Sequence, residues 1–279
     1  MLTVDIPLIR LSNGDTWTIL LLRSGMTFLS CIVVWSIWRL LRTNVPPLVP
    51  GWTGVAVASL YAMGTVTFML AVFNTSTANL VFILAFNSMF AALLSWIFLK
   101  ERPRPITIVA MFVMLSGVLL IVSDGVGTGN FIGNLLALAT ACLLASAITV
   151  SRASRKDMGF TPLVAVLLPF SVALVMVSKG GFHVETPWWI IFNGAIVMPI
   201  AFFCLANGPK YISGPEVAMF YLLETVLAPV WVWMIFSEVP SRNSLIGGTI
   251  LIVTLVIHSL WQLNDVRRRR ATLALRHPA

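Results

Sequence analysis

Apolar residues run along the chain in stretches of about 20, separated by short segments that carry charge, proline or glycine. A helix that rises about 1.5 Å per residue needs about 20 apolar residues to cross the roughly 30 Å hydrocarbon core of a bilayer. The pattern therefore predicts nine membrane-spanning helices. They are expected at about 17–38, 52–73, 78–99, 105–123, 131–151, 162–178, 187–207, 215–237 and 243–263.

One of these runs recurs later in the chain. Asn79–Pro103 matches Glu216–Pro240 without a gap, and tryptophan, glutamate and proline stand at equivalent places. The same offset brings Trp52 onto Trp189. Such a repeat indicates a duplicated structural unit. Because the two copies lie five spans apart, they cross the membrane in opposite directions, which predicts two inverted five-helix repeats.

The expected fold is therefore an all-α integral membrane bundle. Residues 1–124 form its first half, residues 131–263 its second half, and residues 264–279 a basic tail. Two five-helix repeats require ten helices, and residues 1–15 are too polar to supply the first. We interpret them as the end of a missing first helix and its loop, explained by a misassigned start or a truncation rather than by a true nine-helix protein.

Composition agrees with a membrane protein, since 58% of the residues are hydrophobic, 10% are charged and the mean hydropathy is +0.95. The net charge of +8 does not indicate nucleic acid, because most of the 18 basic residues fall in alternate loops and in the tail. Basic residues accumulate on the cytoplasmic side. We expect a bacterial inner (plasma) membrane protein with a cytoplasmic C-terminus and an external N-terminus.

Short motifs mark both halves of the chain. They are Trp96–Pro103 and Gly117 in the first half, Phe236–Pro240 and Gly247-Gly248 in the second, and Leu22-Arg23 near the start of the first span. With these motifs, residues 15–263 resemble the ten-helix EamA group of the drug/metabolite transporter superfamily. The resemblance implies a central cavity between inverted halves, alternating access, and export or uptake of small metabolites.

The strongest candidate for a substrate or proton pathway is Glu224, about halfway along its span. A carboxylate at this depth must face a wet cavity, find a partner or take up a proton. The alternative is a protonated glutamate that ties two helices together. Its repeat partner is Asn87, so the two halves would offer a carboxylate and an amide at related depths. Asn79 and Glu216 lie near helix ends, where solvated positions are the expected ones.

Other candidates for the pathway are Arg23, Tyr61, Tyr221 and Trp35. Arg23 is expected to extend its side chain toward water at the outer face. The resemblance implies a structural, gating or substrate-binding role for it. The three aromatic residues could stack on an aromatic or cationic solute, or simply pack within the bundle. His258 is expected to pack between helices, with proton transfer as the alternative.

No catalytic or metal-binding pattern is visible, so we expect neither an enzyme nor a cofactor. Cys31, Cys142 and Cys204 lie in apolar spans and are expected to be small core residues. The arginines of the tail are expected to contact anionic lipids; they are Arg267, Arg268, Arg269 and Arg270. A homodimer is a further hypothesis.

Two functions compete. The first is a secondary transporter that moves a small organic metabolite, such as an amino acid or an amphipathic cation, between the two halves. The second is a non-transporting membrane protein, either a scaffold or an intramembrane enzyme. Polar residues gathered on one shared cavity would favour transport, whereas a dry and closed core would favour the scaffold.

Overall fold

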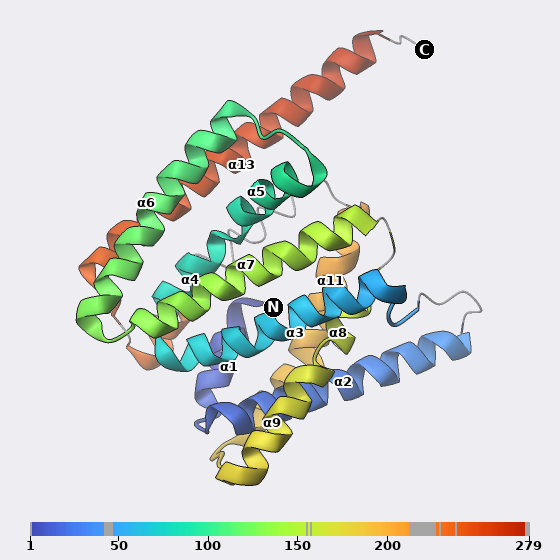
Figure 1. Ribbon diagram of the computed structural model, residues 1–279, viewed down its shortest axis with the longest axis vertical. Helices are drawn as coiled ribbons and strands as arrows, with labels where there is room; N and C mark the ends of the chain where they lie inside the picture. Colours follow the sequence, from blue (N-terminus) through green and yellow to red (C-terminus); the bar gives the residue numbers. More distant parts are fainter. Residues whose placement is uncertain are drawn as a thin grey trace.

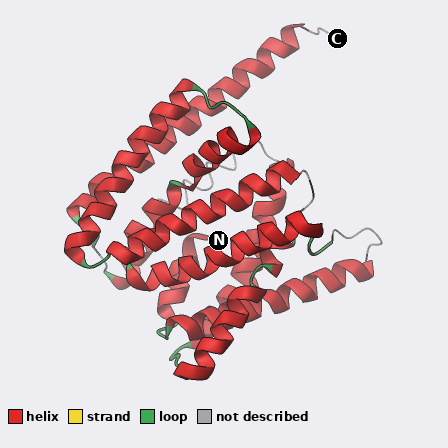
Figure 2. Cartoon of the chain, viewed as in Figure 1, coloured by secondary structure: helices red, strands yellow, loops and turns green. Residues whose placement is uncertain are grey.

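The computed structural model describes residues 2–41, 47–154, 156, 158–211, 227–228, 230–237 and 239–276. Within these ranges the chain is helical, and the only extended pairing is an isolated antiparallel bridge between Gly14 and Val184 (Figures 1 and 2). The all-α prediction is therefore confirmed for the described part of the chain.

Eight helical stretches are long and apolar enough to cross a membrane, which makes the protein polytopic. They match the predicted spans, except that most of the expected span at 215–237 lies outside the described residues. The elements, in chain order, are η1 (Leu2–Val4), α1 (Asp5–Leu11), α2 (Thr16–Leu41), α3 (Gly51–Asn74), α4 (Thr77–Ala85), α5 (Asn87–Leu99), α6 (Pro105–Thr128), α7 (Phe131–Ser154), α8 (Thr161–Val164), α9 (Leu167–Gly180), α10 (Pro187–Phe192), η2 (Asn193–Val197), α11 (Met198–Tyr211) and α13 (Arg242–Arg276).

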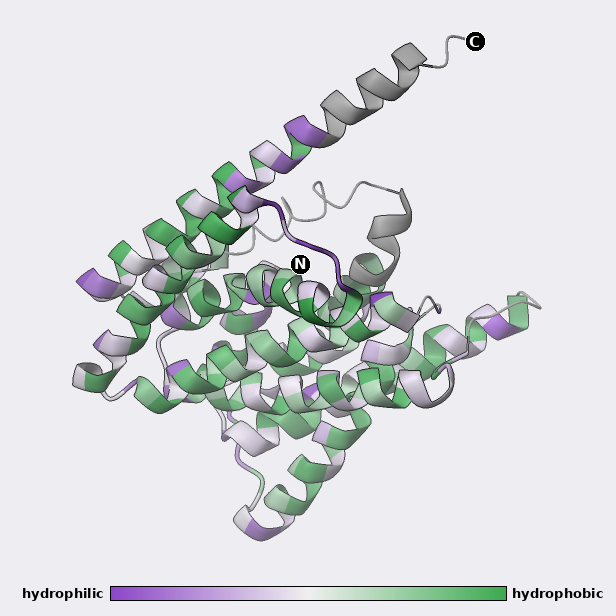
Figure 3. Cartoon of the chain, turned by 45° about the horizontal axis from the view of Figure 1, so that its top comes forward, coloured by the Kyte–Doolittle hydropathy of each residue, from purple (hydrophilic) through white to green (hydrophobic). Residues whose placement is uncertain are grey.

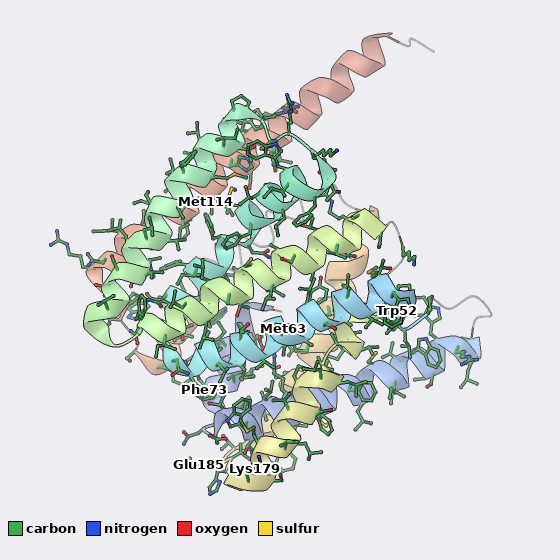
Figure 4. The ribbon with its side chains drawn as sticks, in the orientation of Figure 1. Trp52, Met63, Phe73, Met114, Lys179 and Glu185 are labelled. Atoms are coloured by element: carbon green, nitrogen blue, oxygen red, sulfur yellow. The ribbon has the colours of Figure 1, made fainter. Side chains whose placement is uncertain are left out.

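The helices are apolar along most of their length, and hydrophilic residues lie mainly at helix ends and connections (Figure 3). Trp52, Met63 and Phe73 are spaced along α3 and are all exposed (Figure 4). Exposed apolar side chains in such numbers would aggregate in water, so lipid must cover them. The exposed faces thus fit the hydrocarbon layer that the apolar runs predicted.

Three helix pairs build the framework: α3 packs on α7, α6 on α13, and α2 on α9 (Figure 1). Small residues set the closest approach in the α6–α13 pair. A Cβ atom on Gly117 would lie 2.9 Å from the Gly247 carbonyl oxygen, and one on Gly247 would lie 2.6 Å from the Gly117 oxygen. Glycines of this kind let two helix backbones meet in a membrane. Met114 of α6 is fully buried in the core.

Two of the spans are interrupted four residues before a proline. The break between α8 and α9 lies at Ala165 and Val166, and Pro169 follows; the π-helical segment η2 contains Ala195, and Pro199 follows. Proline cannot donate a hydrogen bond to the carbonyl four residues earlier, and its ring presses against that carbonyl. Both interruptions therefore have a local cause in the sequence.

The π-helical segment also touches α2 closely. Ser30 of α2 donates a hydrogen bond of 2.8 Å to the Ala195 carbonyl oxygen. Pro199 has no backbone N–H group to donate to that oxygen. Next to it, a Cβ atom on Gly194 would lie 2.6 Å from the Arg23 carbonyl oxygen, so only glycine permits this approach. As a result, the Asn193 side chain reaches the polar groups of α1 and α2.

Candidate functional site

A cavity of about 420 Å³ lies inside the bundle. Its walls come from both halves of the chain: α1 to α6 belong to residues 1–124 or adjoin them, and α7, α11 and α13 belong to the second half. Most of the lining surface is apolar, with polar groups set among it. The described polar side chains that line it are Asp5, Arg23, Tyr61, Thr65, Asn87, Ser88, Thr107, Thr140, His258, Ser259 and Gln262.

A buried ion pair forms one part of the wall. Arg23 Nη2 lies 2.8 Å from Asp5 Oδ2, and both side chains are less than 10% exposed. Asn193 joins them, because its Nδ2 donates to Asp5 Oδ1 at 2.7 Å and its Oδ1 accepts from Arg23 Nε at 3.3 Å. We call Asp5, Arg23 and Asn193 the Asp5 cluster. The guanidinium also lies 5.6 Å from the centre of the Phe68 ring.

The position of Arg23 corrects one expectation. The side chain does not extend toward water at the outer face; it is 7% exposed and faces Asp5 and the cavity. A buried guanidinium needs a nearby carboxylate and full hydrogen bonding, and Asp5 and Asn193 supply both. The sequence interpretation missed Asp5 because residues 1–15 were interpreted as the end of a missing first helix and its loop. A lone carboxylate inside the otherwise apolar Val4–Leu8 was the available signal.

Asn87 lies where the third span is broken. Phe86 separates α4 from α5, and Asn87 is the first residue of α5. Its Oδ1 atom is buried and has no hydrogen-bond partner among the described residues. Ser88, which follows, bonds to the Ala85 carbonyl oxygen of the preceding turn at 3.2 Å. Interrupted helices of this kind expose polar groups at membrane depth where they line a cavity.

Tyr61 and His258 also line the cavity, from α3 and α13. His258 Nε2 is 3.0 Å from Thr107 Oγ1 of α6, and the imidazole stacks on Trp261 with ring centroids 6.3 Å apart. Its contact with α6 is the interhelical packing that the sequence suggested. Arg23, Tyr61 and Asn87 are thus brought to one cavity from three different spans.

The remaining predicted residues lie elsewhere. Trp35 packs beside a separate group around Cys31 and Phe160, and the Arg39 guanidinium carbon lies 5.1 Å from its ring centre. Glu224 and Tyr221 lie outside the described residues, as does Glu216. The side chains of the tail arginines also lie outside the described part; they are Arg267, Arg268, Arg269 and Arg270.

Asn79 corrects a second expectation, since it is 2% exposed rather than solvated. Asn134 Oδ1 accepts from Thr75 Oγ1 at 2.6 Å and from Asn79 Nδ2 at 3.4 Å. Ser244 Oγ donates to Asn79 Oδ1, and Ser241 Oγ donates to Asp124. We call these residues the Asn134 network; its members are Thr75, Asn79, Asp124, Asn134, Ser241 and Ser244. It joins the ends of α3 and α6 to the starts of α4, α7 and α13.

No group of three or more histidine, cysteine, aspartate or glutamate side chains with metal-binding geometry occurs among the described residues. The chemistry that the cavity offers is therefore hydrogen bonding, one buried guanidinium and carboxylate pair, and apolar surface. Pockets that bind small organic molecules have this composition and this order of size.

The sequence is similar to a known protein family over part of its length. Residues 7–123 match the sequence model of the EamA-like transporter family. The matched residues are the first part of the chain, and over them the sequence is similar to that family. The EamA match confirms the resemblance to the drug/metabolite transporter superfamily that the motifs suggested.

A curated protein and a solved structure match the chain beyond its first half. An uncharacterised transporter of Clostridium kluyveri is 24% identical over 235 residues, which cover 77% of this chain and 73% of that protein. A solved crystal structure is also similar to this chain, with a TM-score of 0.67 and 16% sequence identity. The match covers 93% of this chain and 94% of the chain in that structure. At that identity the second likeness concerns the fold alone.

Proposed function

We propose that this EamA-like protein is a secondary transporter of small organic metabolites that works by alternating access. The observation that carries the proposal is the cavity itself, because residues from both halves meet there and bring polar groups to membrane depth. A scaffold needs no such space. The cavity volume of about 420 Å³ suits a solute of the size of an amino acid or a small aromatic cation.

We further propose that the bundle consists of two inverted five-helix repeats, with residues 1–124 and 131–263 as the halves. Three contacts support this arrangement. The repeat relates α6 to α13 and α2 to α9, and the two helices of each pair are in contact. The α3 and α7 contact has a counterpart in the contact of α10 and η2 with α1. Alternating access then follows from rocking one half against the other.

The interrupted third span supports a role for Asn87 in solute binding. Its buried Oδ1 has no partner among the described residues, and such an atom costs about 1–3 kcal/mol unless a ligand or water donates to it. Glu224, the repeat partner of Asn87, remains the proposed acidic group of the second half. The proposed location is the inner membrane of a bacterium with a cytoplasmic C-terminus, and the tail arginines would contact anionic lipids.

Transport by reconstituted protein tests the proposal. Purified protein in liposomes is offered radiolabelled amino acids, monocarboxylates and quaternary ammonium cations, with and without a pH gradient. We expect saturable uptake of at least one class, inhibited by unlabelled solutes of that class. Empty liposomes give the background, and uptake no faster than in empty liposomes for every class would contradict the proposal.

Two variants connect transport to the site. Asn87→Leu and Glu224→Gln are each expected to lower uptake, while Asn74→Leu serves as a control because its Nδ2 bonds to the Leu70 carbonyl oxygen of its own helix. Full activity of Glu224→Gln would remove Glu224 from the mechanism. Full activity of Asn87→Leu would show that the interruption of the third span at Asn87 does not contribute to the binding site.

A further inference from the structure

The guanidinium of Arg23 is only partly occupied by its buried partners. Nε bonds to Asn193, and Nη2 bonds to Asp5 and lies 3.1 Å from Met198 Sδ. The remaining nitrogen, Nη1, makes no hydrogen bond with any described residue, although Arg23 lines the cavity. Both carboxylate oxygens of Asp5 have donors. Nη1, which we call the free edge of this buried cation, is therefore left for a ligand that accepts hydrogen bonds.

The charges around this edge limit what can bind there. Asp5 and Arg23 neutralise each other, and the other titratable side chains lining the cavity in the described part are Tyr61 and His258. Besides α2, which supplies Arg23, α1 packs on η1, α10 and η2, and these three elements contain no charged residue. The other charged side chain of α1, Arg10, donates to the Val72 and Thr75 carbonyl oxygens. A carboxylate is the natural partner of a free guanidinium edge. Its arrival, however, makes two carboxylates share one cation.

Two carboxylates at one buried cation do not both stay charged at low cost. Like charges at short range disfavour the ionised form, and a surplus buried charge is expensive. A proton released by a hydronium ion or a buffer acid of the surrounding solution, whose bond to that proton breaks, removes the surplus. It forms an O–H bond on the Asp5 carboxyl, Arg23 remains a cation, and the net charge of the site is the same before and after binding.

We propose that the cavity binds solutes that carry a carboxylate at the free edge of Arg23, and that each bound carboxylate is accompanied by one proton taken up by Asp5. This inference rests on the proposed transport function and specifies its substrate class and its coupling. Solute and proton then cross in the same direction, and the movement is electroneutral for a monocarboxylate.

Matched pairs of probes test the substrate class. Benzoate, pentanoate and phenylalanine are compared with benzamide, pentanamide and phenylalaninamide, which have similar shapes but no carboxylate. Binding to the purified full-length protein is measured near pH 7 by calorimetry in several buffers of different ionisation enthalpy, which reports the protons exchanged per bound solute. We expect at least one carboxylate to bind roughly tenfold more tightly than its amide, with one proton taken up.

Two variants separate the roles of the pair. Asp5→Asn is expected to keep carboxylate binding, since Arg23 remains, and to abolish the proton uptake. Asp5→Asn combined with Arg23→Gln removes both charges, leaves no unpaired ion, and is expected to lose the preference for carboxylates. Asp15→Asn is the matched control, because Asp15 is exposed and its carboxylate accepts from the Trp17 backbone N–H.

Three results would overturn the inference. The first is proton uptake in Asp5→Asn equal to that of the unchanged protein, and the second is an intact carboxylate preference in the double variant. The third is transport of cations or amides without binding of any carboxylate, which would leave the proposed transport function standing. Absence of binding and of transport for every probe would instead remove the transport function, and the inference with it.

Discussion

Two buried polar clusters in this EamA-like protein differ in how completely their hydrogen bonds are satisfied. In the Asn134 network, both the oxygen and the nitrogen of the Asn134 side-chain amide have protein partners. This network links five helices at their ends. In the Asp5 cluster, one guanidinium nitrogen has no partner in the described part of the chain and the cavity lies beside it. A closed network holds helices together, whereas an open one is available to a ligand.

The sharpest test of the open cluster is removal of its cation. Arg23→Gln leaves the Asp5 carboxylate buried without a counter-charge, and breaking a buried pair in this way costs about 3–5 kcal/mol. We expect a large fall in the unfolding temperature of the purified protein, measured in detergent by intrinsic fluorescence at neutral pH. This is the largest single effect that we expect in either cluster.

The double variant Asp5→Asn and Arg23→Gln shows whether that cost comes from the charge. Replacing a buried ion pair by neutral groups of similar shape is often nearly neutral in stability. The unfolding temperature should therefore recover most of the loss. If the double variant is as unstable as Arg23→Gln alone, packing of the arginine side chain, rather than its charge, stabilises this region.

The second prediction concerns the helix pair beside the closed network. Gly247→Leu places a Cβ atom 2.6 Å from the Gly117 carbonyl oxygen, so α6 and α13 must separate. Overpacking of this kind costs about 1–3 kcal/mol. Gly127→Leu is the control, because nothing lies within 4 Å of a Cβ atom there. Equal unfolding temperatures for the two variants would show that the close crossing is not required.

The third prediction applies one substitution to both kinds of site. Asn134→Leu leaves Thr75 and Asn79 without their shared acceptor, at a cost of about 1–3 kcal/mol. Asn87→Leu removes an oxygen that has no partner among the described residues, so stability should be unchanged or slightly higher while uptake falls. Unfolding and transport measured on the same preparations would separate these effects. A loss of stability in Asn87→Leu as large as in Asn134→Leu would erase the distinction.

The sequence predicted the spans well because the bilayer imposes one simple requirement on each of them. A run of about 20 apolar residues must form a helix, whatever its neighbours are. Eight of the expected spans therefore appear within a few residues of the predicted bounds. The prolines Pro169 and Pro199 likewise act locally, and the interruptions before them follow from the sequence alone.

The polar clusters could not be predicted in the same way because their partners come from distant segments. Asn79 was expected in solvent, yet it meets Ser244, which is 165 residues away in the chain. Arg23 was expected to reach water, yet it meets Asp5 and Asn193, and Asn193 is positioned by a π-helical turn. Burial of a polar residue depends on the packing of whole helices, about which a single apolar run carries no information.

The smallest expected effect concerns an ion pair that belongs to neither cluster. Arg152 Nη2 lies 3.2 Å from Glu101 Oε2 and both side chains are about half exposed, so water and salt screen the pair. Glu101→Gln should therefore change the unfolding free energy by at most about 1 kcal/mol, and less at high salt. The unfolding free energies of the two proteins, measured at about 0.05 M and at about 0.5 M salt, give both the cost of the substitution and its dependence on salt. Glu101→Gln could instead cost as much as Arg23→Gln, with no change at high salt. That result would mean that burial does not separate strong from weak ion pairs in this bundle.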